Sequence, residues 1–422
     1  MAHEATPDIV RPPRDRAVPK SWVAALLLAT VGVAAGWFGP IQILLPAQAA
    51  ALGEEIGKEN LLALVSGIGA AAAIVANPLW GLLSDRLSID RPRRRPVVAA
   101  GLVVGVAGLG VLAAAPDAGW MVVGWVFVQV GLNGPFAALL AMIADRVPDE
   151  RRGLVGSLFG VAQIVGVVLG TAVAVAVGEG AIGYVAIAVA VPLLCTAILV
   201  APEARTASAT ASVDDRALPT AGSRPLRQVL AALRPTAAFG WAWLVRLLVN
   251  LVNALVLVYL YYYLADRVGV DDPGTWVLVL TLVNVVIAAV AAGVGGAWSD
   301  RIARRRVFVV VAVAALAAGA VVFALFPDPA AVIAATVLIG AGWGLYVAVD
   351  VAIITQVLPS DRSTGSMLGI ANIAASLPQV LAPLIAAPLV TDLGGYPVLY
   401  LVTAAISLLA LAVLPRLRGV VG

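Results

Sequence analysis

Two ionisable side chains of this 422-residue sequence lie inside long apolar stretches. Arg246 lies about ten residues into the apolar run 236–265, which is roughly 15 Å along a helix that rises 1.5 Å per residue. Asp350 lies in the run 330–357. A charge within such a run is costly and marks a functional site, usually paired and facing a cavity. We expect Arg246 to bind an anionic or hydroxyl group and Asp350 to take up a proton. A structural ion pair between the two is the alternative.

Amide side chains recur at helical spacing near these charges. Asn250 and Asn253 follow Arg246 by four and seven residues, so the three share one helix face. Gln129 and Asn133 lie one turn apart in another apolar run. The spacing predicts a wetted stripe in each run. Taken singly, each amide is as well explained by a hydrogen bond between neighbouring helices.

A short motif with an acid occurs twice, each time where an apolar run ends. Gly81 is followed by Asp85 and Arg86, and half a chain later Gly296 is followed by Asp300 and Arg301; an arginine cluster comes after each. An acid at such a junction can cap a neighbouring helix or pair with an arginine. We therefore predict a gate at each copy, with simple anchoring of the membrane topology as the alternative.

A second repeat supports a duplicated chain. Residues 147–153 match residues 358–365, allowing one extra residue, and both repeats occur in the same order in each half. Two related halves place a solute site between them, near the middle of the membrane.

The sequence contains no motif that indicates an enzyme. The single histidine, His3, lies in the N-terminal tail, and the single cysteine, Cys195, lies in an apolar run. No phosphate-binding loop, zinc-protease motif or paired-cysteine motif is present. We expect no metal, no cofactor and no enzymatic activity.

The composition indicates an all-α polytopic membrane protein. Hydrophobic residues make up 62% and charged residues 12% of the chain, and the mean hydropathy is +1.01. Continuous apolar runs of about 20 residues are long enough to span a bilayer as helices. Twelve such runs are predicted, at residues 21–49, 60–83, 97–115, 118–143, 154–177, 181–201, 236–265, 274–298, 307–326, 330–357, 366–391 and 395–415.

The basic residues set the predicted orientation. Of the 27 Lys and Arg residues, all but Lys58, Arg246 and Arg267 fall in the tails or in loops on one side of the predicted membrane. Because cytoplasmic loops collect Lys and Arg, we expect both termini in the cytoplasm, and a plasma-membrane location. The predicted organisation is an N-terminal tail, a six-helix bundle, a polar linker, a second six-helix bundle and a C-terminal tail, at residues 1–20, 21–201, 202–235, 236–415 and 416–422.

With the paired motifs and twelve spans in view, the chain resembles the major facilitator superfamily. The resemblance rests on Gly81-x-x-x-Asp85-Arg86 and its copy Gly296-x-x-x-Asp300-Arg301. It implies two pseudo-symmetric six-helix bundles that transport a small molecule by alternating access. It also implies that Asp85 engages the helix start near Gly365 and Asp300 the one near Gly153 when the cytoplasmic side closes.

A second likeness concerns the solute. Residues 133–135, 348–350 and 377–383 resemble those of sucrose–proton symporters and related glycoside carriers, which implies proton coupling and a sugar-like solute. A drug or metabolite exporter and a transporter-like sensor without transport are the alternatives. The expected partners are a small solute, protons and the lipid bilayer, with neither nucleic acid nor an obligate protein partner.

Overall fold

The computed structural model describes residues 18–87, 94–201, 236–302, 305–357 and 364–417. Inside these ranges, the side chains of residues 85, 87, 149, 300, 351, 355, 357, 364–369 and 417 are not described. The predicted linker 202–235, most of the N-terminal tail and the C-terminal residues 418–422 lie outside the described residues.

Within the described ranges every regular element is helical, and twelve helices are long and apolar enough to cross a membrane. The all-α membrane fold and the twelve predicted spans are therefore confirmed. In the first half the elements are α1 (Lys20–Gly39), η1 (Pro40–Leu44), α2 (Leu45–Leu52), α3 (Lys58–Leu87), α4 (Arg95–Ala114), α5 (Ala118–Arg146), α6 (Asp149–Val177) and α7 (Ala181–Val200).

The second half follows the same plan. Its elements are α9 (Ala237–Val258), α10 (Leu260–Tyr262), η2 (Tyr263–Val268), α11 (Pro273–Ile302), α12 (Arg305–Leu325), α13 (Pro329–Val357), α14 (Thr364–Thr391), α15 (Gly395–Val413) and η3 (Leu414–Leu417). The first span of each half is interrupted toward its far end, by the π-helical turn η1 in one and by Tyr259 and the π-helical turn η2 in the other. Such turns are frequent at functional sites.

Three aspartates, each at the start of a helix, accept a hydrogen bond from that helix's first turn. Asp117 accepts a hydrogen bond from the backbone N–H of Trp120 at the start of α5. Asp272 does the same for α11 and Asp328 for α13. A carboxylate at this position satisfies a backbone donor that the helix itself leaves unpaired. The three aspartates are thus helix caps.

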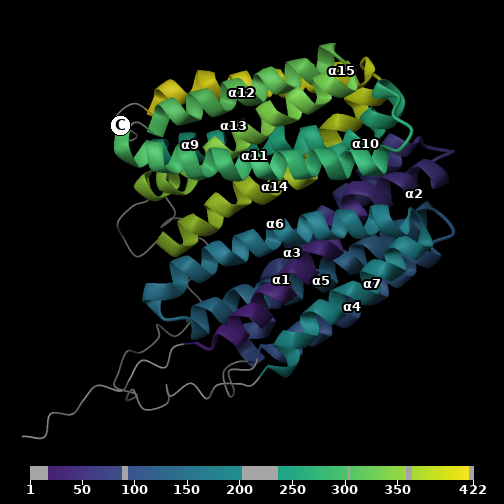
Figure 1. Ribbon diagram of the computed structural model, residues 1–422, viewed down its shortest axis with the longest axis vertical. Helices are drawn as coiled ribbons and strands as arrows, with labels where there is room; N and C mark the ends of the chain where they lie inside the picture. The colour runs from purple at the N-terminus through teal and green to yellow at the C-terminus, as the bar shows by residue number, and fades with distance from the viewer. Residues whose placement is uncertain (1–17, 88–93, 202–235, 303–304, 358–363, 418–422) are drawn as a thin grey trace, which may run out of the picture.

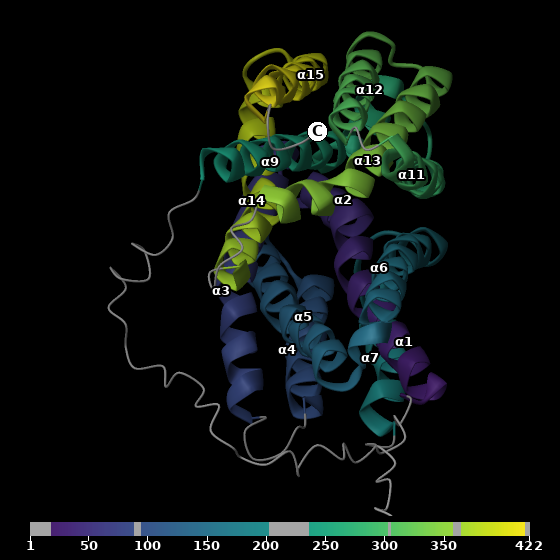
Figure 2. The same cartoon turned by 90° about the vertical axis from the view of Figure 1, so that its left-hand side faces the viewer.

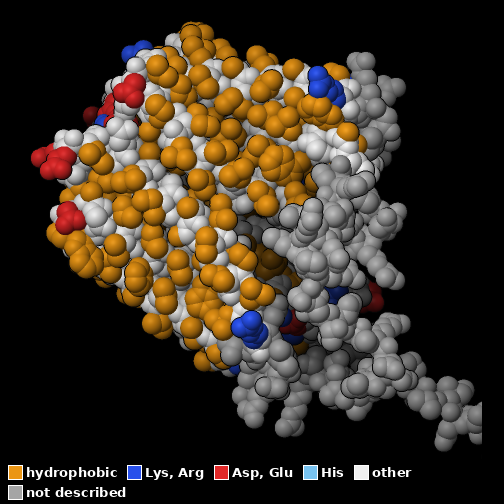
Figure 3. All heavy atoms as spheres, turned by 180° about the vertical axis from the view of Figure 1, so that it is seen from behind, with side chains coloured by type: hydrophobic (Ala, Val, Ile, Leu, Met, Phe, Trp, Pro, Cys, Tyr) orange, Lys and Arg blue, Asp and Glu red, His pale blue; other side chains and the backbone are white. Residues whose placement is uncertain are grey.

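The helices form two groups that lie side by side (Figures 1 and 2). Helices α1 to α7 form one group and α9 to α15 the other, and the groups meet where α3 packs on α14 and α6 on α11. The exact domain boundaries stay a prediction. Apolar side chains cover the face shown in Figure 3, with charged side chains at its margins, as expected for a surface in lipid.

Close backbone contact holds α4 against α5. A Cβ atom added to Gly131 would lie only 2.2 Å from the backbone nitrogen of Gly105. Small residues let membrane helices approach in this way, so that dispersion forces can act over a long contact.

Candidate functional site

The two charges inside the membrane spans form an ion pair. One terminal nitrogen of Arg246 (Nη1) on α9 lies 3.0 Å from Oδ2 of Asp350 on α13, and both side chains are mostly buried. The hydroxyl of Tyr346, one turn before Asp350, donates to Oδ1 at 2.7 Å. Each carboxylate oxygen therefore has its own donor. Both partners belong to the second half, so the pair does not join the two halves.

The amides on α9 lie beside this pair. Arg246, Asn250 and Asn253 are all half-buried on one helix, as their spacing predicts. The side-chain amide of Asn250 donates to the backbone carbonyl of Arg246 at 2.8 Å. One of its two N–H donors is thus used by its own helix.

The amides of the first half behave alike. Asn133 on α5 is buried and donates to the carbonyl of Gln129 at 2.7 Å. Gln129 is half-buried. The structure brings each predicted amide pair together along its own helix, but among the described residues it shows no contact of Gln129 or Asn133 with the ion pair.

Aromatic rings from three helices of the first half meet one another. Trp37 on α1 and Phe136 on α5 meet edge to face with ring centres 5.5 Å apart, and Phe136 lies 5.8 Å from Phe159 on α6. Trp37 and Phe136 are half-buried, whereas Phe159 is buried. We call these three residues the aromatic cluster.

An ion pair joins the two halves at one end of the molecule. The ammonium of Lys58, at the start of α3, lies 2.7 Å from both carboxylate oxygens of Asp266 in η2. The hydroxyl of Tyr396 donates to Asp266 at 2.7 Å and to Glu59 at 3.1 Å, so one phenol connects acids from both halves.

Three neighbouring tyrosines add to this closure. Tyr259 donates to the carbonyl of Glu59, Tyr261 to the carboxylate of Glu179, and Tyr262 to the carbonyl of Pro46. These donors come from the second half and their acceptors from the first. We call this end, where α2, α10 and η2 meet, the tyrosine end.

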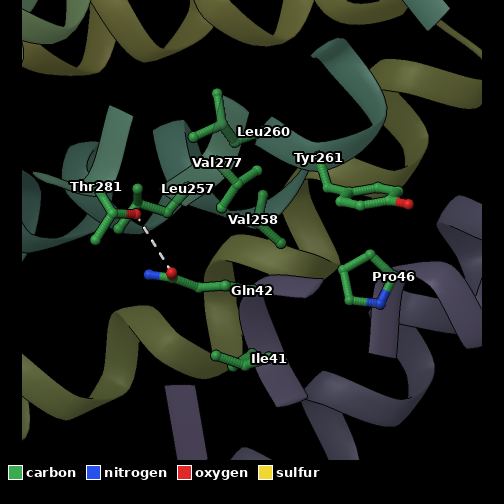
Figure 4. A pocket seen from close by; sticks show the side chains of 9 residues that line it. All are labelled: Ile41, Gln42, Pro46, Leu257, Val258, Leu260, Tyr261, Val277 and Thr281. Carbon is green, nitrogen blue, oxygen red and sulfur yellow. Dashed lines mark hydrogen bonds between the residues drawn. The ribbon is translucent and has the colours of Figure 1, made fainter. Parts of the chain in front are cut away.

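A small pocket lies between the halves beneath the tyrosine end (Figure 4). Its free volume is about 20 Å³, which is room for one water molecule. The amide oxygen of Gln42 accepts from Thr171 at 2.7 Å and, across the pocket, from Thr281 at 3.3 Å. The lining residues are Ile41, Gln42, Pro46, Leu257, Val258, Leu260, Tyr261, Val277 and Thr281.

The opposite end, where α3 and α11 end and α1 begins, is the arginine end. Arg86 and Arg301 are exposed there, and the side chains of Asp85 and Asp300 lie outside the described residues. A Cβ atom on Gly81 would meet nothing within 4 Å, and one on Gly296 would meet only Ala348, in its own half. The predicted gate residues thus make no described contact with the opposite half.

The arginine end is braced within the first half instead. Arg94 lies 2.6 Å from Asp145 and donates to the hydroxyl of Ser84 at 2.8 Å, which ties α3, α4 and α5 together. Gly153, Gly156 and Gly160 along α6 also have open space where a side chain would be. Figure 3 shows a hollow between the two halves near this end. Among the described residues, the halves are therefore joined by side-chain contacts at the tyrosine end, and no such contact is recorded between them at the arginine end.

Sequence reasoning missed the residues of the tyrosine end. Lys58, Glu59, Asp266 and Tyr396 each look like ordinary loop or interface residues in the sequence. One signal was available, since Lys58 is one of only two basic residues in the loops assigned to the poorly charged side. The structure also places the three neighbouring tyrosines of this end in contacts between the halves.

Known structures share this fold over almost their whole length. A peptide transporter POT in complex with sulfate matches with TM-score 0.72 and 14% identity, covering 98% of this chain and 97% of that one. A mutant of the nucleoside transporter NupG matches with TM-score 0.73 and 10% identity, covering 94% of this chain and 100% of that one.

A bacterial homolog of the human lysosomal transporter Spinster, in an inward-facing and occupied conformation, matches with TM-score 0.71 and 14% identity, covering 95% and 97%. At these identities the likeness concerns the fold. No curated protein sequence matches the chain. The sequence profile of the Major Facilitator Superfamily matches residues 26–383 and 276–420. With twelve membrane helices in two groups and a profile match over most of its length, the chain belongs to the Major Facilitator Superfamily.

Proposed function

We propose that this protein is a secondary active transporter that moves a small organic solute across the plasma membrane by alternating access, coupled to protons. The observation that carries the proposal is the pair of Arg246 and Asp350, mostly buried within spans of a molecule whose halves are closed at one end only. A buried carboxylate with a cationic partner can exchange that partner for a proton, which is what coupling requires.

The arginine end is assigned to the cytoplasm because Lys and Arg collect there. With that orientation the structure corresponds to an inward-facing state, closed to the outside by the tyrosine end. Asp85 and Asp300 are then the gate residues of the other state, in which the arginine end closes. The exposed positions of Arg86 and Arg301 and the open space at Gly81 fit a gate that is open here.

The experiment is uptake into proteoliposomes under an imposed pH gradient, with a panel of labelled glycosides, nucleosides, dipeptides and organic anions. Asp350→Asn should abolish uptake driven by the pH gradient while exchange of solute across the membrane continues. The matched control is Asp392→Asn, which removes an exposed acid after α14. If Asp350→Asn kept full pH-driven uptake, Asp350 would not be the coupling acid.

The direction of net movement separates importer from exporter. Sugar or glycoside uptake is the candidate given by the sequence likeness, and drug or metabolite efflux is the runner-up. A protein that shows neither movement of any solute nor exchange between two states would instead be a sensor.

A further inference from the structure

Two buried donors on side chains that keep some exposure have no hydrogen-bond partner among the described residues. They are Nε of Arg246 in the second half and the indole Nε1 of Trp37 in the first. The remaining unpartnered donors are on side chains at most 4% exposed: Trp22, Trp125, Ser299 and Tyr400. A buried donor without an acceptor costs about 1–3 kcal/mol. A solute with an acceptor oxygen would therefore gain most at the unpartnered Nε of the charged Arg246.

The ion pair leaves Arg246 able to bind a second acceptor. Its recorded contact with Asp350 uses Nη1, whereas a guanidinium has five N–H donors in a rigid fork suited to a two-oxygen anion. Asp350 does not depend on this contact for its position, since Tyr346 holds its other oxygen. An anionic group can thus replace Asp350 at Arg246 while the carboxylate stays in place.

Phe136, in the aromatic cluster of the first half, lies at about the same distance from the arginine end as Arg246. Phe136 lies ten residues before the end of α5 at Arg146, and Arg246 lies nine residues after the start of α9 at Ala237. Both are thus about 14–15 Å from the arginine end, at 1.5 Å per residue. In the first half all Asp, Glu, Lys and Arg residues lie at helix ends or in loops. The aromatic cluster therefore has no neighbouring charge from its own half at mid-span.

We propose that the solute is an amphipathic organic monoanion. This rests on the proposed transport function. Its anionic group binds the guanidinium of Arg246, and its flat apolar body packs on Trp37 and Phe136. The carboxylate of Asp350, having lost its guanidinium partner, binds the proton that travels with the solute. One monoanion and one proton carry no net charge, so transport is electroneutral.

The test uses three probes that separate charge from apolar body. They are 2-naphthalenesulfonate, a permanent anion that does not cross lipid as a neutral acid; 2-naphthyl β-glucoside, which has the same rings without the charge; and methanesulfonate, which has the charge without the rings. The first should bind the purified protein at least tenfold more tightly than the other two. Its uptake should follow the pH gradient and should not change when potassium and valinomycin set a membrane potential.

Substitutions at Arg246 and Trp37 test separately the contact with the anionic group and the contact with the apolar body. Arg246→Gln should abolish binding and Arg246→Lys should retain part of it, because an ammonium keeps the charge but not the fork. Trp37→Leu should weaken 2-naphthalenesulfonate about fivefold, the usual size of an aromatic contact, and leave methanesulfonate unchanged. The controls are Arg267→Gln and Trp120→Leu, which alter exposed residues near the tyrosine end.

Three results would overturn the proposal: tighter binding of the glucoside, uptake that follows the membrane potential, or no binding of any probe. The proposed function is tested separately, by spin labels that report exchange between two states without a solute. If the two states exchange but no anion binds, the proposal of a monoanion is wrong and the proposal of a transporter stands. Absence of exchange would reject the transporter itself.

Discussion

Replacement of Lys58 by Met tests whether the ion pair at the tyrosine end holds the two halves together. Lys58 lies 2.7 Å from both oxygens of Asp266, and the two side chains are 30% and 36% exposed. Exposed ion pairs contribute roughly 0.2–1 kcal/mol because solvent screens them. Contact with both oxygens places this pair near the upper limit, at about 1 kcal/mol. Tyr396 still donates to Asp266 in the variant, so the acid keeps one partner.

A loss of about 1 kcal/mol changes the ratio of two states roughly fivefold. Spin labels at positions 56 and 393 would report the separation of the halves at the tyrosine end, since Ile56 and Leu393 are exposed and lie in different halves. The native Cys195 is buried and does not compete for the label. We expect Lys58→Met to increase the population with the long distance about fivefold, as should Asp266→Asn.

The two changes remove the same contact, so the double variant should open the tyrosine end little further than either single variant. Exchanging the two charges, with Lys58→Asp and Asp266→Lys, should restore the closed population. Arg267→Gln, a neighbouring exposed change, should have no effect. An unchanged distance distribution in Lys58→Met, or full additivity in the double variant, would refute the ion pair as the lock.

Two further predictions concern stability. Hydrogen bonds from the hydroxyl and backbone N–H of Thr275 hold the pKa of Asp272 below its ordinary value, so the stabilisation is present above the unfolded-state pKa and is lost as pH falls through the folded one. Asp272→Ala should therefore cost about 1 kcal/mol at pH 7, seen as a lower thermal midpoint, and the difference from the parent should shrink as the pH falls below the ordinary aspartate pKa of about 3.9. Gly131→Val should destabilise by about 3 kcal/mol or more, because its side chain would collide with the backbone of Gly105; Gly110→Val, where nothing lies within 4 Å, is the control in the same melting assay.

The membrane helices and the central ion pair could be predicted from the sequence because the bilayer allows few backbone structures and few unpaired charges. Within lipid, a continuous apolar run can pair its backbone N–H and C=O groups only by forming a helix. An isolated charge inside a span needs a partner, and Arg246 and Asp350 were the two candidates of opposite sign. The pairing could be predicted from the charges alone. The hydrogen bond from Tyr346 to Asp350 could be recognised only in the structure.

The tyrosine end could not be predicted in the same way. Lys58, Glu59 and Asp266 lie near water, where an unpaired charge costs little free energy. Their presence in the sequence therefore does not predict a partner. Their contacts depend on how the two halves meet, which is a property of one conformation. The gate roles of Asp85 and Asp300, predicted from a repeat, also concern one conformation, and their side chains lie outside the described residues. Their proposed contacts belong to the state in which the arginine end is closed.

Closure of the two ends is mutually exclusive in alternating access, so variants at opposite ends should act in opposite directions. Lys58→Met removes a contact of the state closed at the tyrosine end, and Asp85→Asn should weaken the state closed at the arginine end. The first variant should lengthen the distance between labels at 56 and 393, and the second should lengthen the distance between labels at Leu154 and Ile302, both exposed near the arginine end. Because each change shifts one shared equilibrium, the double variant should return toward the parent distribution at both label pairs. Two single variants that moved the equilibrium in the same direction would show that Asp85 does not distinguish the states, and its gate role would be wrong.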